Sequence, residues 1–261
     1  MRVVTLTTDF GTRDYYVGTM KGVLLRINTD IRIVDLTHEI EKQEIVEAAI
    51  VLRSSRGFFP EGSIHIAVVD PGVGGPQRPI MVESSGQFYI GPDNGIFSYV
   101  IEDDYRAWEI ENADYRLKSV SDTFHGRDIF APAAGHLSLG VSPESFGSRI
   151  DNLTRIQARR PMHFTDRVVG EVIHVDSFGN LITNVSKALL HEISDGRAVR
   201  LRISGRTVEG VSKTYSAVEV GQLVALFGST DLVEIAVRDG NAHRKLGVGR
   251  GDPVVLTVEA T

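Results

Sequence analysis

Residues 66–79 read I-A-V-V-D-P-G-V-G-G-P-Q-R-P, an apolar run that ends in a carboxylate, a glycine-rich loop and an arginine. The pattern predicts a buried strand that delivers Asp70 to the open edge of a sheet, where α/β proteins bind their ligands. The loop from 71 to 79 can return Arg78 toward that carboxylate, and its glycines let backbone amides approach a ligand closely. The alternative is a strand that ends in an ordinary turn carrying a solvated aspartate.

Short β-rich runs alternate with helical stretches around this segment, from the N-terminus to about residue 150. Alternation of this kind predicts an α/β fold with a mostly parallel sheet flanked by helices on both faces. We expect strands at 3–7, 31–36, 64–69, 81–83 and 87–90, and helices at 15–28, 45–53, 95–100 and 130–139.

The pattern changes after a polar, arginine-bearing connector at 151–161, where short alternating strands are separated by glycine turns. This spacing is typical of a small antiparallel barrel or sandwich. We therefore expect two domains, an N-terminal α/β catalytic domain at 1–155 and a smaller C-terminal β domain at 166–261, joined by a linker at 156–165. The expected strands of the second domain are 167–175, 180–185, 198–203, 206–208, 223–227, 232–237 and 252–258.

The composition restricts the class of protein and its partners. The chain has 261 residues, of which 42% are hydrophobic and 24% are charged, values that are ordinary for a globular protein. A formal net charge of -6 argues against a nucleic-acid partner, and the lack of cysteine excludes disulfides, thiolate metal sites and cysteine nucleophiles. The N-terminus has no signal-peptide pattern and no segment approaches ~20 consecutive apolar residues, so we expect no membrane association and a cytoplasmic location.

Two further segments of the first half carry candidate functional side chains. Asp9 follows the first expected strand in T-T-D-F-G (7–11), and an ionised carboxylate there is a strong acceptor for the vicinal hydroxyls of a ribose. An N-cap for the following helix explains Asp9 equally well. His125 stands in F-H-G-R-D (124–128), where the glycine leaves room for a small ligand such as water, although a lone histidine is often structural.

The second half places acid, aromatic and amide groups at one strand junction, in D-S-F-G-N-L-I-T-N at 176–184. An aromatic face beside a carboxylate suits a cationic ligand, and a bulge or a tight turn is the alternative. The residues at 227–237 resemble a loop that feeds an edge strand and offers hydroxyl and backbone groups. Sequence signatures of common phosphate, metal and acyl-transfer sites are missing, so no metal is required.

Taken together, five motifs in chain order resemble the S-adenosylmethionine (SAM) hydroxide adenosyltransferase family, whose relatives are the SAM-dependent fluorinase and chlorinase. The motifs are T-T-D-F-G at 7–11, V-D-P-G-V-G-G-P-x-R at 69–78, F-H-G-R-D-I-F-A-P at 124–132, D-S-F-G-N-L-I-T-N at 176–184 and the segment at 228–242. The resemblance implies an N-terminal α/β domain, a C-terminal antiparallel β-barrel and a homotrimer. It also implies active sites between the N-terminal domain of one subunit and the C-terminal domain of its neighbour.

The resemblance further implies that water or hydroxide displaces methionine from the 5′ carbon of SAM, giving adenosine and L-methionine. SAM is then a substrate, and no cofactor is expected. By similarity, Asp70, Arg78 and His125 position and activate the water, and Asp9 holds the ribose hydroxyls. The other substrate contacts implied are Asn180 for the ribose or adenosine, Asp176 with Phe178 for the methionine ammonium group, and Ser229, Glu234 and Val237 around the adenosine or methionine ends.

Two positions favour hydrolysis over halogenation. The fluorinase has tyrosine where Asp70 stands, and a tyrosine-serine pair where His125 and Gly126 stand. A carboxylate at position 70 repels a halide and favours a polarised water. The alternatives are a SAM-dependent halogenase, a non-catalytic nucleoside-binding module, and a metal-dependent phosphoesterase that would use Asp9, Asp70, Asp93 and Asp128.

Overall fold

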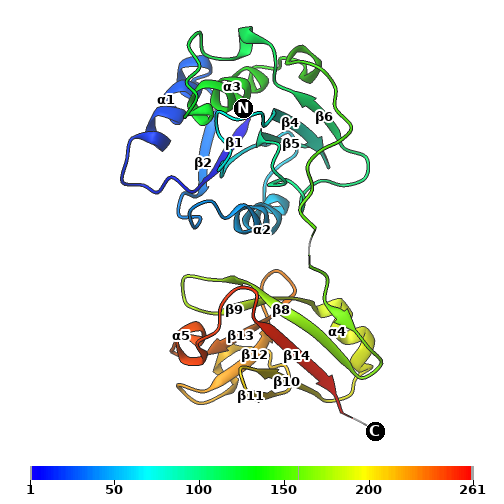
Figure 1. The fold of residues 1–261 in the computed structure, drawn as a ribbon. Helices are drawn as coiled ribbons and strands as arrows, with labels where there is room; N and C mark the ends of the chain where they lie inside the picture. Colours follow the sequence, from blue (N-terminus) through cyan, green and yellow to red (C-terminus); the bar gives the residue numbers. More distant parts are fainter. Residues whose placement is uncertain (1, 158, 260–261) are drawn as a thin grey trace. The chain divides into compact units, whose positions relative to one another are not determined.

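The computed structural model describes residues 2–157 and 159–259 and divides into two compact units, 1–157 and 158–261 (Figure 1). The first unit is α/β and the second is an antiparallel β structure, which confirms the predicted fold class. Residue 158 of the predicted linker, and residues 1, 260 and 261 of the predicted domains, lie outside the described residues. In the part of the chain that is described, no helix has the length and apolar character needed to cross a bilayer.

The N-terminal unit is built on a six-stranded sheet with the order β2-β1-β3-β5-β4-β6. The first four strands of this order run parallel, and β4 is antiparallel to both of its neighbours. The sheet is therefore mostly parallel, as the alternating pattern predicted. Its strands are β1 (Val3–Thr8), β2 (Arg32–Thr37), β3 (Ile64–Val68), β4 (Pro79–Ser84), β5 (Gln87–Pro92) and β6 (Arg106–Glu109).

Helices cover both faces of this sheet. α1 (Tyr16–Ile27) and α3 (Ala131–Ser138) pack together on one face, and α2 (Ile45–Ser55) lies on the other (Figure 1). Strand β3 contributes to both cores because its side chains alternate: Ile66 packs with α1 and α3, while Ala67 packs with α2. This two-sided burial explains why β3 reads as a continuous apolar run.

The chain adds β2 on one side of β1 and β3 on the other, and all three strands run parallel. Strand β1 leads to β2 through α1 on one face, whereas β2 leads to β3 through α2 on the other face. Crossovers that diverge in this way leave a crevice beyond the carboxyl ends of the two central strands. Thr8 is paired with Val68 in the parallel register, so Asp9 and Asp70 both lie just beyond that edge.

The predicted helix at 95–100 is wrong, because the segment forms consecutive turns. Gly95 adopts a φ of 93°, outside the helical region, and the hydrogen bond from Ser98 N to Gly95 O spans only three residues. The predicted helix at 130–139 is α3, but a π-helical turn, η3 (Gly126–Phe130), precedes it. Strand β6 was not predicted, nor were the 3₁₀ turns η1 (Arg56–Phe58), η2 (Ala113–Tyr115) and η4 (Pro143–Ser145).

The C-terminal unit is a nearly closed antiparallel barrel with the strand order β11-β10-β14-β8-β9-β13-β12, and β7 pairs with β8. An isolated bridge between Ser212 and Leu226 brings the two ends of this order together. Inward side chains such as Leu201, Ile235 and Leu256 form its core. Its strands are β7 (Met162–His163), β8 (Arg167–Val175), β9 (Leu181–Ser186), β10 (Val199–Ile203), β11 (Arg206–Glu209), β12 (Leu223–Phe227), β13 (Leu232–Val237) and β14 (Pro253–Val258).

Two helices and one turn of the barrel were not predicted: α4 (Lys187–Ser194), α5 (Ala242–Leu246) and η5 (Tyr215–Ala217). Both helices begin after a side chain that caps them. Ser186 accepts a hydrogen bond from Leu189 N, and Asn241 accepts one from Arg244 N. These caps were the sequence signal available for the two helices.

Candidate functional site

A cavity of about 480 Å³ opens at the carboxyl edge of the N-terminal sheet. Four separate segments line it: the residues after β1, those before α2, the loop after β3 and the loop before η3. Its polar side chains are Asp9, Lys42, Gln43, Asp70, Thr123 and His125. Phe10 and Phe124 supply an aromatic wall, with ring centroids 5.7 Å apart in an edge-to-face arrangement.

Asp9 is held from the loop before α2. Its carboxylate accepts a hydrogen bond from Gln43 N at 3.0 Å, and its carbonyl oxygen accepts one from Lys42 Nζ at 2.5 Å. Helix α1 begins at Tyr16 with no side-chain cap, so the N-cap interpretation of Asp9 is wrong. Gln43 has a φ of 67°, a strained conformation for a residue with a side chain, and such strain is common where a backbone group serves a site.

The Asp70 carboxylate is half-buried at the floor of the same crevice. It accepts hydrogen bonds from Gln77 Nε2 at 2.8 Å and from Gly72 N at 3.2 Å. Burial raises the pKa of Asp70 above its ordinary value, and the charge of Asp9 acts in the same direction. The two hydrogen bonds and the charge of His125 oppose this rise without cancelling it. The carboxylate therefore has more affinity for a proton than a solvated aspartate has.

His125 faces the cavity from the residue that precedes η3. Its loop is fixed against the Asp70 loop through Gly74, whose φ is 78°: a Cβ at this position would lie 2.3 Å from Asp122 O. On the far side of His125, the buried Asp128 binds the Arg127 guanidinium at 2.6 Å and accepts a hydrogen bond from Ser121 N. The loop that carries the imidazole is thus in contact with Gly74 at Asp122 and is held at its other end by the bonds of Asp128.

Arg78 does not line the cavity that Asp70 and His125 share. Its guanidinium donates to Asp93 Oδ2 at 2.5 and 3.1 Å, and to the side chain and carbonyl of Asn152 at 3.2 and 2.7 Å. Among the described contacts, Gln77 occupies the place beside Asp70 that we expected for Arg78. The three residues of the expected water-positioning set are therefore divided, with two facing one cavity and the third bound to Asp93.

The C-terminal unit gathers a second polar cluster around Asp176. This carboxylate accepts hydrogen bonds from Asn180 N at 2.8 Å and Asn180 Nδ2 at 3.0 Å. Nearby, Glu234 accepts a hydrogen bond from Tyr215 Oη at 2.6 Å. Burial raises the pKa of Glu234, and burial together with the bond to Glu234 raises the pKa of Tyr215 to about 12. The charge of Asp176 also raises both pKa values, so Asp176, Glu234 and Tyr215 interact electrostatically.

The remaining predicted residues of this unit differ in exposure. Phe178 leaves 76% of its surface exposed next to Asp176, whose carboxylate accepts from Phe178 N at 2.9 Å. Ser229 is exposed on the loop that follows β12. Val237 is only 6% exposed and packs into the core of the barrel. The cluster therefore brings together Asp176, Phe178, Asn180 and Glu234, whereas the side chain of Val237 has a packing role.

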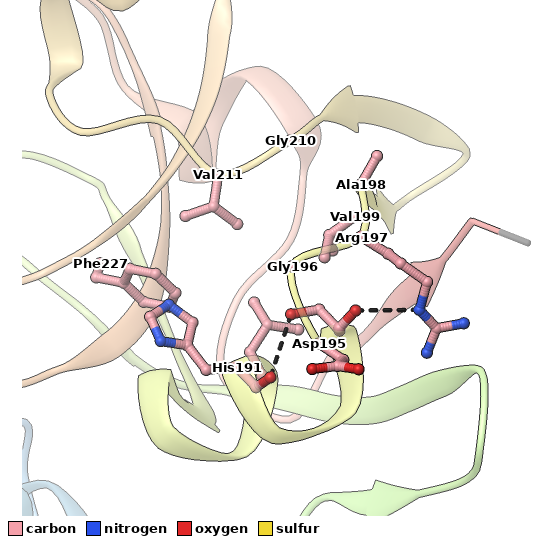
Figure 2. Close-up of a pocket in the computed structure, with 11 residues that line it drawn as sticks. His191, Asp195, Gly196, Arg197, Ala198, Val199, Gly210, Val211 and Phe227 are labelled. Atoms are coloured by element: carbon pink, nitrogen blue, oxygen red, sulfur yellow. Dashed lines mark hydrogen bonds between the residues drawn. The ribbon is translucent and has the colours of Figure 1, made fainter. Parts of the chain in front are cut away.

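A second cavity of about 480 Å³ lies in the barrel beside α4, and none of the predicted site residues lines it (Figure 2). His191 and Phe227 form one wall, with ring centroids 5.5 Å apart. Arg197 uses its guanidinium to bind the last carbonyls of the helix, Ser194 O at 3.1 Å and Ile193 O at 3.0 Å. The guanidinium of Arg197 therefore closes the end of α4 at this cavity.

The phosphoesterase alternative depends on Asp9, Asp70, Asp93 and Asp128, and two of these carboxylates form ion pairs with arginines. Asp93 binds Arg78, and Asp128 binds Arg127. Within residues 2–157 and 159–259, no three His, Cys, Asp or Glu side chains are grouped so as to hold a metal ion.

Sequence reasoning missed four polar residues of these two clusters. Lys42 and Gln43 precede α2 in a polar loop with no motif, and Tyr215 lies in a 3₁₀ turn far along the chain from Glu234. Gln77 stands in the quoted motif itself, where its amide was the available signal.

The comparisons with known proteins agree with one another. Models described as the SAM hydroxide adenosyltransferase N-terminal and C-terminal domains match residues 4–147 and 170–255. A Thermus thermophilus protein named (R)-S-adenosyl-L-methionine hydrolase is 38% identical over 266 residues, covering 98% of this chain and 100% of the relative. The crystal structure of an uncharacterized conserved protein from Thermotoga maritima has a TM-score of 0.91 at 35% identity, covering 97% of this chain and 99% of that one. A Nocardia brasiliensis protein named fluorinase is 27% identical, covering 90% of this chain and 89% of its own.

Proposed function

The chain belongs to the SAM hydroxide adenosyltransferase family, and on that basis we propose that it is an enzyme that hydrolyses SAM to adenosine and L-methionine. The observation that carries the reaction is the cavity in which a half-buried carboxylate of raised pKa, Asp70, shares a wall with His125 and Asp9. Similarity also favours hydrolysis, because identity is 38% to a protein named as a hydrolase and 27% to one named as a fluorinase.

The chemistry asks for a positioned water and a proton acceptor. Water oxygen forms a bond to the 5′ carbon while the bond from that carbon to sulfur breaks, and the electron pair moves onto sulfur. The sulfonium becomes a neutral thioether, so the leaving group needs no acid. One water proton must be released, and holding the water in line removes a large part of the barrier.

Asp70 and His125 are the groups that we assign to the water. Burial keeps the proton affinity of Asp70 high, so the carboxylate is a better base than a solvated aspartate. A ring nitrogen of His125, which lines the same cavity, is the second group that can take part in the proton transfer. We assign Arg78 a supporting role, because its bonds to Asp93 and Asn152 hold the end of the Asp70 loop.

In this proposal the substrate is bound by the N-terminal unit of one subunit and the C-terminal unit of a neighbouring subunit. Asp9 accepts the ribose hydroxyls, since its carboxylate faces the cavity with free acceptor capacity. The cluster of Asp176, Phe178, Asn180 and Glu234 serves the methionine and adenosine ends, with Ser229 on the adjacent loop and Val237 behind it. An acidic cluster with an exposed aromatic ring suits a substrate that carries an ammonium and a sulfonium.

We also propose that the enzyme is a homotrimer in which the polar cluster of one subunit completes the cavity of another. In this proposal the cavity binds the ribose and the water, and the polar cluster binds the methionine and adenosine ends, so one site needs both. An Asp70→Asn subunit and a Glu234→Gln subunit, each inactive alone, would then recover part of the activity when refolded together. No recovery in mixed trimers would contradict shared sites, and light scattering gives the subunit number. A cytoplasmic location remains a prediction.

The activity is tested by incubating the protein with SAM and measuring adenosine and methionine by chromatography. We expect equal amounts of both products, a loss of at least about 100-fold in kcat for Asp70→Asn, and little change in KM. Asp104→Asn, at an exposed aspartate outside the cavity, is the matched control. Absence of both products, or unchanged turnover in Asp70→Asn, would overturn the proposal. A 5′-halogenated adenosine formed with chloride or fluoride would indicate the halogenase alternative, and loss of activity in chelator would indicate a metal-dependent reaction.

A further inference from the structure

We infer that Gln77, and not Arg78, is the residue that positions the Asp70 carboxylate, an inference that rests on the proposed hydrolysis. Gln77 Nε2 donates a 2.8 Å hydrogen bond to Asp70 Oδ1 from the opposite end of the glycine-rich loop. The loop is shaped to allow this contact, because a Cβ at Gly72 would lie 3.1 Å from Gln77 Oε1. Gly72 N donates to the same carboxylate oxygen at 3.2 Å, so Oδ1 is held by two donors and we assign Oδ2 to the water.

The two neighbouring residues cannot exchange these roles without moving strand β4. Consecutive side chains point to opposite sides as a chain enters a strand, so position 77 and position 78 serve different surroundings. Arg78 is fixed on its side by the hydrogen bond from Asp93 N to its carbonyl at 2.9 Å and by the ion pair to Asp93. Asp93 itself is almost fully buried and has Arg78 as its cationic partner. Turning the guanidinium toward Asp70 would leave that charge uncompensated.

A neutral donor has a different effect on Asp70 from a guanidinium. The charged groups that face Asp70 are His125 and Asp9, while Lys42 from the loop before α2 lines the same cavity. A guanidinium in contact would add a full positive charge and make the carboxylate a weaker base. The amide of Gln77 orients the carboxylate through one hydrogen bond and leaves its pKa raised by burial. Gln77 is thus a positioning residue that acts through Asp70.

The test compares Gln77→Leu, Gln77→Ala and Gln77→Arg with Arg78→Lys in the full-length protein. Two quantities are measured for each: the pH profile of kcat/KM for SAM, and the titration midpoint of the Asp70 carboxyl carbon by NMR, assigned by its loss in Asp70→Asn. Gln222→Leu, at an exposed glutamine of the C-terminal unit, is the matched control. Gln77→Ala removes the donor without adding bulk, in case Gln77→Leu fails to fold.

We expect Gln77→Leu and Gln77→Ala to move the acid limb of the profile and the NMR midpoint to higher pH, because a hydrogen bond to the ionised form is lost. On the acid limb, kcat/KM should fall on the order of tenfold. Gln77→Arg should move both to lower pH, and Arg78→Lys should leave both midpoints in place. Unmoved midpoints in the Gln77 variants, or a shift in Arg78→Lys, would overturn the inference. If the wild-type protein does not hydrolyse SAM, the proposed function fails, but the NMR midpoints still decide which residue contacts Asp70.

Discussion

The Arg78 guanidinium binds the Asp93 carboxylate through two hydrogen bonds, of 2.5 and 3.1 Å, and this pair ties the Asp70 loop to the segment that leaves the N-terminal unit. Asp93 accepts a further hydrogen bond from Thr154 N at 2.8 Å, and Arg78 donates to the carbonyl of Asn152 at 2.7 Å. The pair therefore joins three parts of the chain that are distant in sequence. Its side chains are 28% and 4% exposed, so the charges interact with limited screening by water.

Replacing Asp93 with asparagine should lower the free energy of unfolding by about 2 kcal/mol, because the substitution leaves the Arg78 charge without its partner. Urea unfolding followed by tryptophan fluorescence measures this change, since Trp108 lies in β6 of the same unit. Asp151→Asn is the control: its contact with Arg149 is 3.6 Å long and its side chain is 89% exposed, so no measurable change is expected. A variant as stable as the wild-type protein would mean that the pair is solvated in solution.

His65 should make the N-terminal unit less stable as the solution becomes acidic. The side chain is fully buried on β3, bonded to Thr5 Oγ1 at 2.8 Å and stacked on Tyr89, and burial lowers its pKa from 6.5 to about 4. The unfolded chain therefore binds a proton more readily than the folded one. The stabilising contribution is complete above pH 6.5 and is lost as the pH falls toward 4.

Between pH 7.5 and pH 5 this linkage costs about 2 kcal/mol. Urea unfolding of the wild-type protein and of His65→Phe at both pH values isolates the contribution of His65. The variant should lose less stability on acidification, although at pH 7.5 its free energy of unfolding should be lower than that of the wild-type protein because Thr5 loses its partner. Equal losses in both proteins would show that His65 is protonated at no cost in the folded state.

The sequence predicted the features that depend on local pattern. Asp9 and Asp70 were found because each directly follows an apolar strand, and parallel strands bring such ends to one edge. We expected Arg78 beside Asp70, whereas the structure places Gln77 there. Neighbouring residues in this loop point to opposite sides, and the spacing of the motif does not tell which of the two faces Asp70. The contact between Tyr215 and Glu234 carries no local signal, since the closure of the barrel creates it.

The ionised side chain of Glu234 should destabilise the barrel at neutral pH. Burial and the nearby Asp176 raise its pKa, so the folded state holds the proton more strongly than the unfolded state does. Stability therefore increases as the pH falls through the folded pKa, and the ionised form is the costly one. Residues kept at a cost to stability are typical of functional sites.

Glu234→Gln should consequently be more stable than the wild-type protein at pH 8, by about 1 kcal/mol, and the difference should disappear near pH 4. The amide oxygen can still accept the hydrogen bond of Tyr215. Urea unfolding at the two pH values measures the effect, with the exposed Glu219→Gln as the control. If Glu234→Gln is less stable at pH 8, the carboxylate supports the fold and the functional interpretation of its burial is wrong.

Asp9 should recognise the two ribose hydroxyls of the product adenosine. The backbone N–H of Gln43 donates a hydrogen bond to Asp9 Oδ2, which orients the Asp9 side chain. We assign the other carboxylate oxygen, in the cavity, to the ribose hydroxyls. Asp9→Asn keeps the shape but loses the charge, so adenosine affinity should fall on the order of tenfold in calorimetry. The matched ligand is 2′,3′-dideoxyadenosine, which lacks both hydroxyls. The wild-type protein should bind it more weakly than adenosine. Asp9→Asn should bind the two nucleosides with similar affinity, because in this variant the diol no longer has a charged acceptor. Asp104→Asn should retain the wild-type preference, and an Asp9→Asn variant that still discriminates between the two nucleosides would place the ribose contact on another residue.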